Sequence, residues 1–515
     1  MKVSGAEGMT IRIFTLGLAM ILALGAGAQA HADDAAKPDS GSAADSKGKD
    51  AIDLPLFPAD ATVKQTIRIG KGALNYTATV GSLPVRDDKG KKIGEVVFTA
   101  YVLAGQDPGS RPVTFAFNGG PGAASVYLNL GAVGPKHVPF GGQGDTPSTS
   151  AQLVDNPDTW LDMTDLVFID PIGTGFSRSL VSDDESKKHF YAMKVDISYL
   201  SRIVYDWLQK NGRMASPKYL VGESYGGFRA PRIAHYLQTV QGVGISGIVM
   251  LSPYLDGNFE NDDDTSPMGW AVRLPSMAAA KLEREGKLSP EALQPVEEYA
   301  RTSFLNDYMR GPKDEAATTR IVGRISDLLG VDPALAQTMG GRVDTQTLLR
   351  ELYRRQGKVG SRYDINVTTY DPFPFSYQAR TGGDEDPILD GVIAPTTSAM
   401  VDFDTRVVGW KVEGAYHALS SDVGKNWTFE DVTPESVTDL RQAMAIDPRM
   451  KVLIAHGYTD LSCPFFASQL IIDQMPAMGD ANRIRLAIYP GGHMFYSRPD
   501  SRAALHRDVA AIYAR

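Results

Sequence analysis

The sequence predicts an α/β fold in which a mostly parallel sheet is covered by helices on both faces and carries a largely helical insertion. Two observations lead to this class. Short, almost continuously apolar runs alternate with stretches of helical spacing, and strands of this kind are buried on both faces. The alternation stops between about residues 258 and 432 and then resumes. The expected strands are 113–117, 166–169, 219–221, 245–251, 452–455 and 484–488.

The N-terminal residues are typical of an export signal. Arg12 precedes the apolar stretch IFTLGLAMILALGAG, and alternating alanines in AQAHA offer a cleavage site. We therefore expect a signal peptide over residues 1–32 and a disordered linker over 33–53, where Asp, Ser, Ala, Lys and Gly leave little to bury. Cleavage would give an exported protein, periplasmic or secreted, with no stable membrane insertion afterwards. A retained anchor helix is the alternative.

The sheet domain is expected in two parts, 54–257 and 433–515, separated by a cap over 258–432. In the first part, Asp88-Lys89-Gly90 turns the chain of an early hairpin, VRDDKGKKIGEVVFTAYVL. A helix follows later, with apolar residues at helical spacing before Gly212 stops it. A separate second domain is the alternative to the cap, but the return of the strand pattern favours an insertion.

Composition and charge exclude several classes of function. A formal charge of -9 over 515 residues and a pI near 5.5 give no basic surface for nucleic acid. Cys463 is the single cysteine, so no disulfide forms within the chain, which fits a bacterial periplasm. The acidic loop GGDEDP matches no calcium-binding spacing, which favours a solvated loop over a calcium site. The serine-dependent chemistry described below needs no metal or organic cofactor, and none is expected. The oligomeric state is left open.

An apolar run ends abruptly in YLVGESYGG, where a serine stands two residues from a glycine on either side. This Gly-x-Ser-x-Gly pattern, placed where a strand turns into a helix, is typical of the nucleophile elbow of α/β-hydrolases. We attribute the two glycines to the tight turn. The elbow would project the Ser224 hydroxyl into an open site at the carboxyl end of the sheet and aim the amide of Tyr225 at a developing oxyanion.

A serine hydroxyl needs a base, and the base needs an orienting carboxylate. α/β-Hydrolases place these residues after the serine in the order acid, then histidine. Asp460 follows the strand KVLIAHGYTD and His493 follows IRLAIYPGGH, both just past strand ends. His456, at a strand edge, and His417, in the insertion, are the competing bases. A turn-capping role is the alternative for Asp460.

The loop FAFNGGPGAAS follows an earlier strand, where α/β-hydrolases place a second amide donor for the oxyanion. We expect the amide of Gly120 to supply it. A bare glycine-rich turn is the alternative.

Taken in order, these blocks resemble the serine carboxypeptidase family: NGGPG, IDPIGTGFS, VGESYGG, GYTDLSC and GGHM. The resemblance implies an α/β-hydrolase fold with an inserted cap, and release of C-terminal residues from peptides through an acyl-enzyme. Carried across by position, it makes Ser224 the nucleophile, Asp460 the orienting acid and His493 the base. It further gives the Gly120 and Tyr225 amides as the oxyanion hole, and Asn118, Gly119 and Glu223 as the residues that hold the substrate's terminal carboxylate.

The sequence also departs from the family pattern. Position 132 is Ala132 where the family has a glutamate that shares a proton with the acid at the position of Glu223. Unless burial or another carboxyl substitutes, Glu223 would then ionise more readily and repel a terminal carboxylate. A strong preference for free-acid peptides that Glu223→Gln leaves unaltered would mean that another group, such as Arg229 or an arginine from the cap, holds the carboxylate. A related esterase, acyltransferase or differently specific peptidase, and a non-catalytic binding protein, are the alternative functions.

Overall fold

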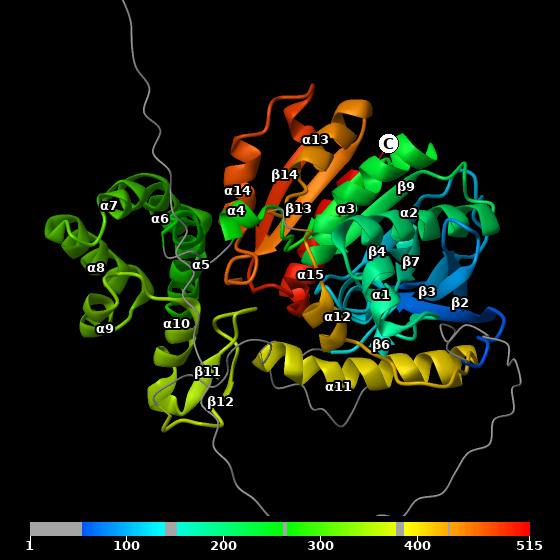
Figure 1. The fold of residues 1–515 in the computed structure, drawn as a ribbon, viewed down its shortest axis with the longest axis horizontal. Coiled ribbons are helices and arrows are strands. Elements are labelled where there is room, and N and C mark those ends of the chain that lie inside the picture. The colour runs from blue at the N-terminus through cyan, green and yellow to red at the C-terminus, as the bar shows by residue number, and fades with distance from the viewer. Residues whose placement is uncertain (1–53, 140–151, 261–264, 377–385, 431–432, 515) are drawn as a thin grey trace, which may run out of the picture. The chain divides into compact units, whose positions relative to one another are not determined.

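The computed structural model describes residues 54–139, 152–260, 265–376, 386–430 and 433–514 (Figure 1). The expected signal peptide and linker lie outside the described residues. The strands are β1 (Ala61–Ile69), β2 (Gly72–Arg86), β3 (Lys92–Leu103), β4 (Val113–Phe117), β5 (Lys136–His137), β6 (Val154–Asp155), β7 (Asp165–Ile169), β8 (Arg178–Ser179), β9 (Lys218–Glu223), β10 (Gly247–Leu251), β11 (Lys358–Gly360), β12 (Thr368–Tyr370), β13 (Lys451–Gly457) and β14 (Ile484–Tyr489).

One large sheet organises the fold, in the order β1-β2-β3-β7-β4-β9-β10-β13-β14. Strands β7 to β14 of this order pair in parallel, whereas β1, β2, β3 and β7 pair antiparallel. Every apolar run expected to be a strand overlaps one of the parallel strands, so the mostly parallel sheet is confirmed. The hairpin β2–β3 is confirmed as well, with its turn closed by a hydrogen bond from the Gly90 amide to the Asp87 carbonyl.

The sequence reading missed β1, because this strand has an alternating pattern of partly exposed residues, ATVKQTIRI, and no continuous apolar run. Edge strands of this kind leave a weaker signal than buried central strands.

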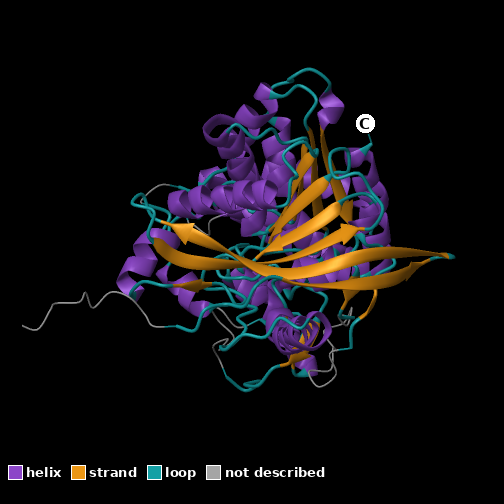
Figure 2. Cartoon of the chain, turned by 90° about the vertical axis from the view of Figure 1, so that its right-hand side faces the viewer, coloured by secondary structure: helices purple, strands orange, loops and turns teal. Residues whose placement is uncertain are grey.

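Helices cover both faces of the twisted sheet (Figure 2). On one face, α2 contributes Leu200, Val204 and Trp207 to a hydrophobic cluster with the strands. The helices are α1 (Asp183–Phe190), α2 (Met193–Lys210), α3 (Tyr225–Tyr236), α4 (Gly257–Glu260), α5 (Met268–Arg284), α6 (Pro290–Tyr299), α7 (Leu305–Arg310), α8 (Glu315–Leu329), α9 (Pro333–Thr338), α10 (Thr345–Glu351), α11 (Pro387–Asp402), α12 (Ser421–Asn426), α13 (Val437–Ile446), α14 (Phe465–Asp473) and α15 (Pro499–Tyr513).

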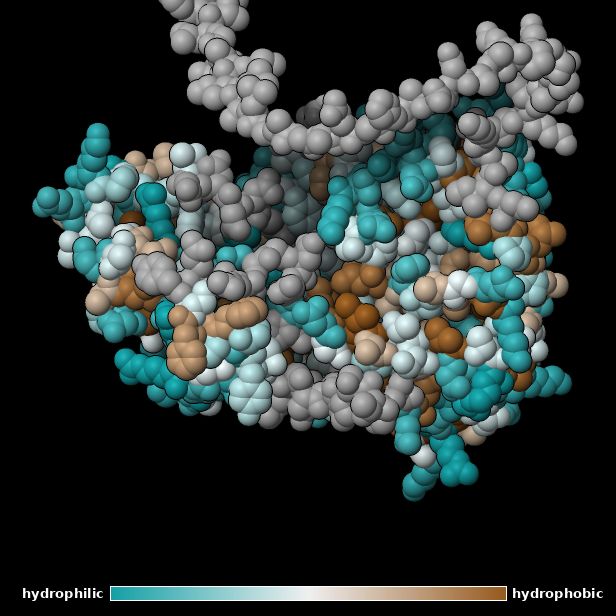
Figure 3. Space-filling model, turned by 60° about the horizontal axis from the view of Figure 1, so that its bottom comes forward, coloured by the Kyte–Doolittle hydropathy of each residue, from teal (hydrophilic) through white to brown (hydrophobic). Residues whose placement is uncertain are grey.

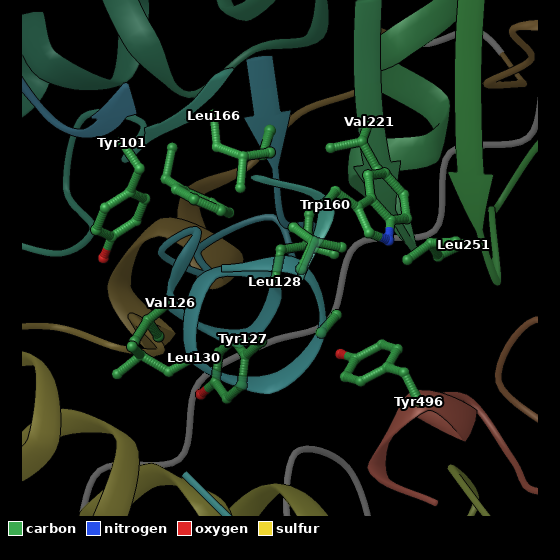
Figure 4. Close-up of a cluster of buried hydrophobic side chains, with 14 of the residues drawn as sticks. Tyr101, Val126, Tyr127, Leu128, Leu130, Trp160, Leu166, Val221, Leu251 and Tyr496 are labelled. Carbon is green, nitrogen blue, oxygen red and sulfur yellow. The ribbon is translucent and has the colours of Figure 1, made fainter. Parts of the chain in front are cut away.

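Short π-helical and 3-10 segments complete the chain. The π segments are Leu128–Val133, Leu237–Gln241, Ala300–Phe304 and Phe403–Val408, and the 3-10 segments are Trp160–Asp162, Arg354–Gln356, Ala481–Arg483 and Phe495–Ser497. On the second face of the sheet, the segment 128–133 packs inside a hydrophobic cluster with Trp160 and the strand residues Leu166 and Val221 (Figure 4). Ala123 and Tyr127 of this cluster follow β4 in the chain and also line the candidate site described below.

The residues between β10 and β13 leave the sheet, because these two strands are direct parallel neighbours with Gly247 opposite Lys451. Helices α5 to α10 build a hydrophobic cluster of their own, which also takes in Phe465 and Phe466 of α14. Helix α11 and the segment 403–408 pack instead into the cluster around Trp160, below the sheet in Figure 1. The insertion therefore has two parts with different packing partners, and the domain boundaries given above stay a prediction.

Within the described ranges, no helix is long and apolar enough to cross a bilayer. On the face drawn in Figure 3, brown hydrophobic areas are interrupted by hydrophilic side chains. The most exposed large hydrophobic side chains are Leu56, Tyr370, Met309 and Phe375.

Candidate active site

Ser224 stands at the junction between strand β9 and helix α3. It is one of the few described non-glycine residues with positive φ, at 59°. Its amide donates to the Leu251 carbonyl at 3.0 Å, which ties the junction to the neighbouring strand β10. Backbone strain of this kind persists only where the surrounding structure fixes it.

The two flanking glycines have a role that differs from the one expected. The unusual φ belongs to Ser224 itself, whereas Gly222 and Gly226 are needed because the backbone passes too close for a side chain. A Cβ on Gly222 would lie 2.0 Å from the Gly226 carbonyl oxygen, and one on Gly226 would lie 2.1 Å from the Phe117 carbonyl oxygen. Glycine is therefore required at both positions because the backbones of β9, α3 and β4 pass too close together for a Cβ atom.

Asp460 and His493 form a buried pair at the ends of β13 and β14. The distance from Asp460 Oδ2 to His493 Nδ1 is 2.7 Å. Asp460 Oδ1 accepts from the amides of Ser462 and Cys463, at 2.7 and 3.1 Å. Because a carboxylate only accepts hydrogen bonds, Nδ1 of His493 donates and Nε2 is left as the basic nitrogen.

Burial alone would lower the pKa of His493, but the charge of Asp460 and its hydrogen bond outweigh it and raise the pKa above its ordinary value. The nearby charge of Glu223 raises it further. These groups stabilise the imidazolium form, which is the form a general base takes on during acyl transfer.

A short segment of the insertion, residues 361–367, packs against both loops that carry this pair. The Tyr363 carbonyl accepts from the His493 amide at 2.5 Å, and the Arg362 carbonyl accepts from the Leu461 amide at 3.0 Å. The rings of Tyr363 and His493 meet edge to face, with centroids 5.0 Å apart. Sequence reasoning missed this segment, because nothing in SRYDINV marks it as a neighbour of strands that lie a hundred residues away in the chain.

The loop after β4 lies directly on the elbow. A Cβ on Gly119 would approach the Tyr225 nitrogen to 2.5 Å and the Ser224 Cβ to 2.9 Å, so only glycine fits. Gly120, with φ 97°, and Tyr225 both line the cavity that contains Ser224. Both backbone amides therefore remain candidates for the oxyanion hole, and their role stays a prediction.

Glu223, the residue before Ser224, is buried with both oxygens hydrogen-bonded. Oε2 accepts from the Asn118 amide group, and Oε1 accepts from the Tyr496 hydroxyl at 2.6 Å. Burial raises the pKa of Glu223 above its ordinary value, although His493 and the two hydrogen bonds oppose the rise. Burial thus takes the place of the missing second carboxyl in raising this pKa, as the sequence analysis allowed. The readier ionisation that Ala132 alone would predict is not supported. Tyr496 was missed, because no sequence signal connects it with Glu223.

Positions 132 and 229 are both buried. Ala132 is 1% exposed inside the hydrophobic cluster around Trp160, and it is not among the residues that line the cavity. The Arg229 guanidinium pairs with Asp196 at 2.6 Å and donates to the Asn118 carbonyl at 2.8 Å. Arg229 therefore binds the backbone of the loop that contains Asn118, and its guanidinium is not among the groups that line the cavity.

One cavity of about 310 Å³ joins these groups. It does not include either competing base. The Nε2 atom of His456 lies 2.8 Å from the Ser468 hydroxyl, and burial, with a smaller contribution from His493, lowers its pKa to about 3. His417 pairs through its backbone with Gly175. The cavity is lined by Asn118, Gly119, Gly120, Pro121, Ala123, Tyr127, Glu223, Ser224, Tyr225, Tyr254, Arg362, Tyr363, Leu389, Leu419, Phe429, Ser462, Cys463, His493 and Met494.

Metal ligation is not indicated for the part of the chain that the structure describes, since it contains no group of three or more His, Cys, Asp or Glu arranged around a common point. Most of the acidic loop GGDEDP lies outside the described residues. Its Asp386 is taken up by the Ser361 hydroxyl and the Arg362 amide, at 2.6 and 2.9 Å.

Comparison with known proteins agrees with this geometry. Residues 72–296 match the serine carboxypeptidase family. Serine carboxypeptidase-like 44 of Arabidopsis thaliana is 32% identical over 149 residues, which cover 28% of each chain, and serine carboxypeptidase 1 of Hordeum vulgare is 27% identical over 191 residues, 36% of each. The chain thus spans about a third of the length of these curated relatives. These plant relatives give no support to a bacterial origin.

The serine carboxypeptidase match contains Asn118, Gly120, Glu223 and Ser224, but it ends before Asp460 and His493. The structure brings His493, with its partner Asp460, to the same cavity as Ser224. A solved structure, Kex1(delta)p, a prohormone-processing carboxypeptidase from Saccharomyces cerevisiae, superposes with a TM-score of 0.52 at 16% identity, covering 85% of this chain and 91% of the other. This likeness confirms the expected α/β-hydrolase fold.

Proposed function

We propose that the chain is a serine carboxypeptidase that releases C-terminal residues from peptides through an acyl-enzyme. The observation that carries the proposal is the shared cavity, in which Ser224 on its elbow and His493, oriented by Asp460, meet the Gly120 and Tyr225 amides. The match to serine carboxypeptidases supports the choice among reactions that such a triad performs.

In the first half of the reaction, the Ser224 hydroxyl oxygen bonds to the carbonyl carbon of the last peptide bond while His493 Nε2 takes its proton. The oxyanion of the tetrahedral intermediate accepts from the Gly120 and Tyr225 amides. The carbon–nitrogen bond then breaks, and His493 gives its proton to the leaving amine. Asp460 keeps the imidazole in the required tautomer and stabilises its charged form.

In the second half, water replaces the departed amino acid. His493 takes a proton from the water as its oxygen attacks the acyl carbon, and it then returns a proton to Ser224. The products are the shortened peptide and one free amino acid. Asn118, Gly119 and Glu223 line the cavity beside Ser224, and we propose that the residue to be released binds against them.

Ester hydrolysis or acyl transfer on the same triad is the second candidate. The observation that favours it is the state of Glu223, whose two oxygens already accept from Asn118 and Tyr496, with Ala132 where a second carboxyl would complete the family's carboxylate clamp. A site of that kind would discriminate less between a free C-terminus and a blocked one.

The test is the chemistry of Ser224→Ala. A fluorophosphonate probe should label the unmodified protein and fail to label the variant, and turnover should fall on the order of 10⁶-fold, as it does when a triad serine is removed. Ser198→Ala, a serine on α2 with its hydroxyl directed to Tyr236, is the matched control and should label normally. Mass spectrometry of a mixed peptide pool identifies the bond that is cut. Undiminished labelling of Ser224→Ala would refute the nucleophile.

We also propose that the protein is exported to the periplasm, because residues 1–32 have the features of a signal peptide. N-terminal sequencing of the exported protein should begin at or near His31 or Asp33. An intact N-terminus on membrane-bound material would contradict export by cleavage.

A further inference from the structure

The cavity around Ser224 is lined by one acidic and one basic side chain besides His493. Glu223 is the buried carboxyl next to Ser224, and Arg362 is an exposed arginine of the insertion. Among the described residues that line the cavity, Arg362 is the only arginine or lysine. The anionic group of any substrate would be drawn to it, because Glu223 already accepts hydrogen bonds at both oxygens.

The backbone of Arg362 is fixed from both sides. Its amide donates to Asp386 Oδ2 at 2.9 Å, and its carbonyl accepts from the Leu461 amide at 3.0 Å. The Asp386 carboxylate is held in turn by the Ser361 hydroxyl, at 2.6 Å. Leu461 directly follows Asp460, so the base of the Arg362 side chain is positioned by the same loop that positions the triad acid. A side chain mounted on such a backbone loses less entropy when it binds.

The guanidinium of Arg362 has N–H donors that are available to a ligand. One NH2 group donates to the Tyr363 hydroxyl at 3.1 Å, and the guanidinium carbon lies 5.1 Å from the centre of the Tyr363 ring. In the described part of the chain, Arg362 forms no ion pair within 4.0 Å, although Asp386 acts on it through its charge. Since a guanidinium carries five N–H donors in a planar fork, this arrangement suits a bidentate carboxylate.

We propose that Arg362 is a specificity-determining residue that binds a carboxylate of the substrate. The inference rests on the proposed peptidase function, because peptides carry carboxylates at two places near a C-terminal bond. One is the terminal carboxylate itself. The other is an aspartate or glutamate side chain next to the bond that is cut. Both present the same chemistry to Arg362, and the experiment separates them.

The experiment compares four peptides that differ only in the residue before the scissile bond, Glu or Gln, and in the C-terminus, free acid or amide. Each is assayed for kcat and KM with the unmodified protein, Arg362→Gln, Arg362→Lys and the control Arg355→Gln, an exposed arginine of the same insertion. The unmodified protein should favour one of the two carboxylates by about tenfold or more in KM, as charge-assisted bidentate pairs do. Arg362→Gln should abolish that preference by raising KM for the favoured peptide about tenfold, and Arg355→Gln should retain the preference.

The pattern of the loss identifies the carboxylate. Loss of free-acid preference assigns Arg362 to the C-terminus, and loss of the Glu preference assigns it to the side chain. Arg362→Lys, which keeps the charge and loses the planar fork, should retain part of the preference. Fluorophosphonate labelling of Ser224 verifies folding of each variant. The proposal would be overturned if the ratio of KM values between peptides with and without the carboxylate were the same in the unmodified protein and in Arg362→Gln. It would also be overturned if the unmodified protein showed neither the free-acid nor the Glu preference.

Binding to Ser224→Ala separates this inference from the peptidase function. Calorimetry with the same peptides should show carboxylate-dependent affinity that disappears in the double variant with Arg362→Gln. If the unmodified protein releases no residue from any peptide while this binding persists, the peptidase function fails and the role of Arg362 stands. Identical affinities for all four peptides would refute the role of Arg362.

Discussion

The hydroxyl of Tyr496 donates a 2.6 Å hydrogen bond to Oε1 of Glu223, the residue next to Ser224. Both side chains are buried, and they come from segments separated by most of the second half of the chain. The bond favours the ionised form of Glu223 while burial favours the neutral form, and burial prevails, so that the pKa is raised. The pKa of the acid beside the nucleophile is thus raised by burial, and the phenol of Tyr496 opposes the rise.

Tyr496→Phe should raise the pKa of Glu223 further, because it removes a donor that stabilises the carboxylate. If Glu223 contacts the substrate, the pH dependence of KM should move to higher pH with little change in kcat. The lost hydrogen bond should also cost about 1–3 kcal/mol of unfolding free energy. Steady-state kinetics against pH and urea denaturation measure the two effects. A KM profile that moves to lower pH would contradict this account.

Glu223→Gln should lower the pKa of His493. The Glu223 charge is one of the groups that raise that pKa, after the opposing effect of burial and the larger contribution of Asp460. Since His493 must be neutral to accept the Ser224 proton, the acid limb of kcat/KM against pH should shift to lower pH. A peptide with a blocked C-terminus isolates this effect from carboxylate binding. An unmoved acid limb would show that Glu223 does not act on His493.

Gly226→Ala should abolish labelling of Ser224 by a fluorophosphonate probe. The added Cβ would lie 2.1 Å from the Phe117 carbonyl oxygen, so β4 and the elbow would have to separate. Gly323→Ala is the control, because its Cβ meets nothing within 4 Å in helix α8. That change should stabilise the protein by about 0.5–1 kcal/mol through helix propensity. Normal labelling of Gly226→Ala would disprove the requirement for glycine at this position.

Asp196→Asn or Arg229→Met alone should destabilise the protein by about 3–5 kcal/mol, because each leaves the opposite buried charge without its partner. The pair is almost completely inaccessible, at 1% and 0% side-chain exposure, with Nε and Oδ2 2.6 Å apart. The double variant should recover part of the loss. Urea denaturation of the four proteins forms a complete double-mutant cycle. Additive losses would mean that the two charges are not coupled.

Stability should fall as the pH rises from about 4 to beyond 7, owing in part to Asp170 and Asp404. Burial raises the pKa of Asp170 to about 7, and burial followed by the charge of Asp170 raises the pKa of Asp404 well above its ordinary value. A carboxyl with a raised folded-state pKa stabilises the fold at low pH, and the contribution disappears as pH passes through that pKa.

Asp404→Asn should therefore flatten the decline in unfolding free energy between pH 4 and 8. The control is Asp402→Asn, an exposed carboxyl paired with Arg406, whose hydrogen bond to that arginine lowers its pKa below this range. Asp402→Asn should leave the slope unchanged. Equal slopes in Asp404→Asn and the unmodified protein would exclude Asp404 from the pH response.

The sequence alone determined the parallel sheet and the order of the chemical groups. Buried parallel strands need apolar side chains on both faces, so runs such as VTFAF and VLIA identify them without knowledge of their neighbours. Because the carboxyl ends of parallel strands meet at one edge, residues that follow separate strands, such as Ser224 and His493, could be expected to share a site. The glycines around Ser224 were recognised from their spacing in the sequence, but the need for Gly226 comes from its close approach to Phe117 of β4.

Only the tertiary structure decided the pKa of Glu223 and which residue of the insertion lines the site. Burial raises the pKa of Glu223, and this burial depends on the packing of Tyr496 and the loop of Asn118 upon it. Arg362 reaches the cavity because Asp386 and Leu461 fix its backbone there. These contacts join segments without a periodic or motif signal, and a pKa depends on solvent exclusion and charges in three dimensions. Neither property can be read from residue types along the chain, because each is created only when distant segments pack together.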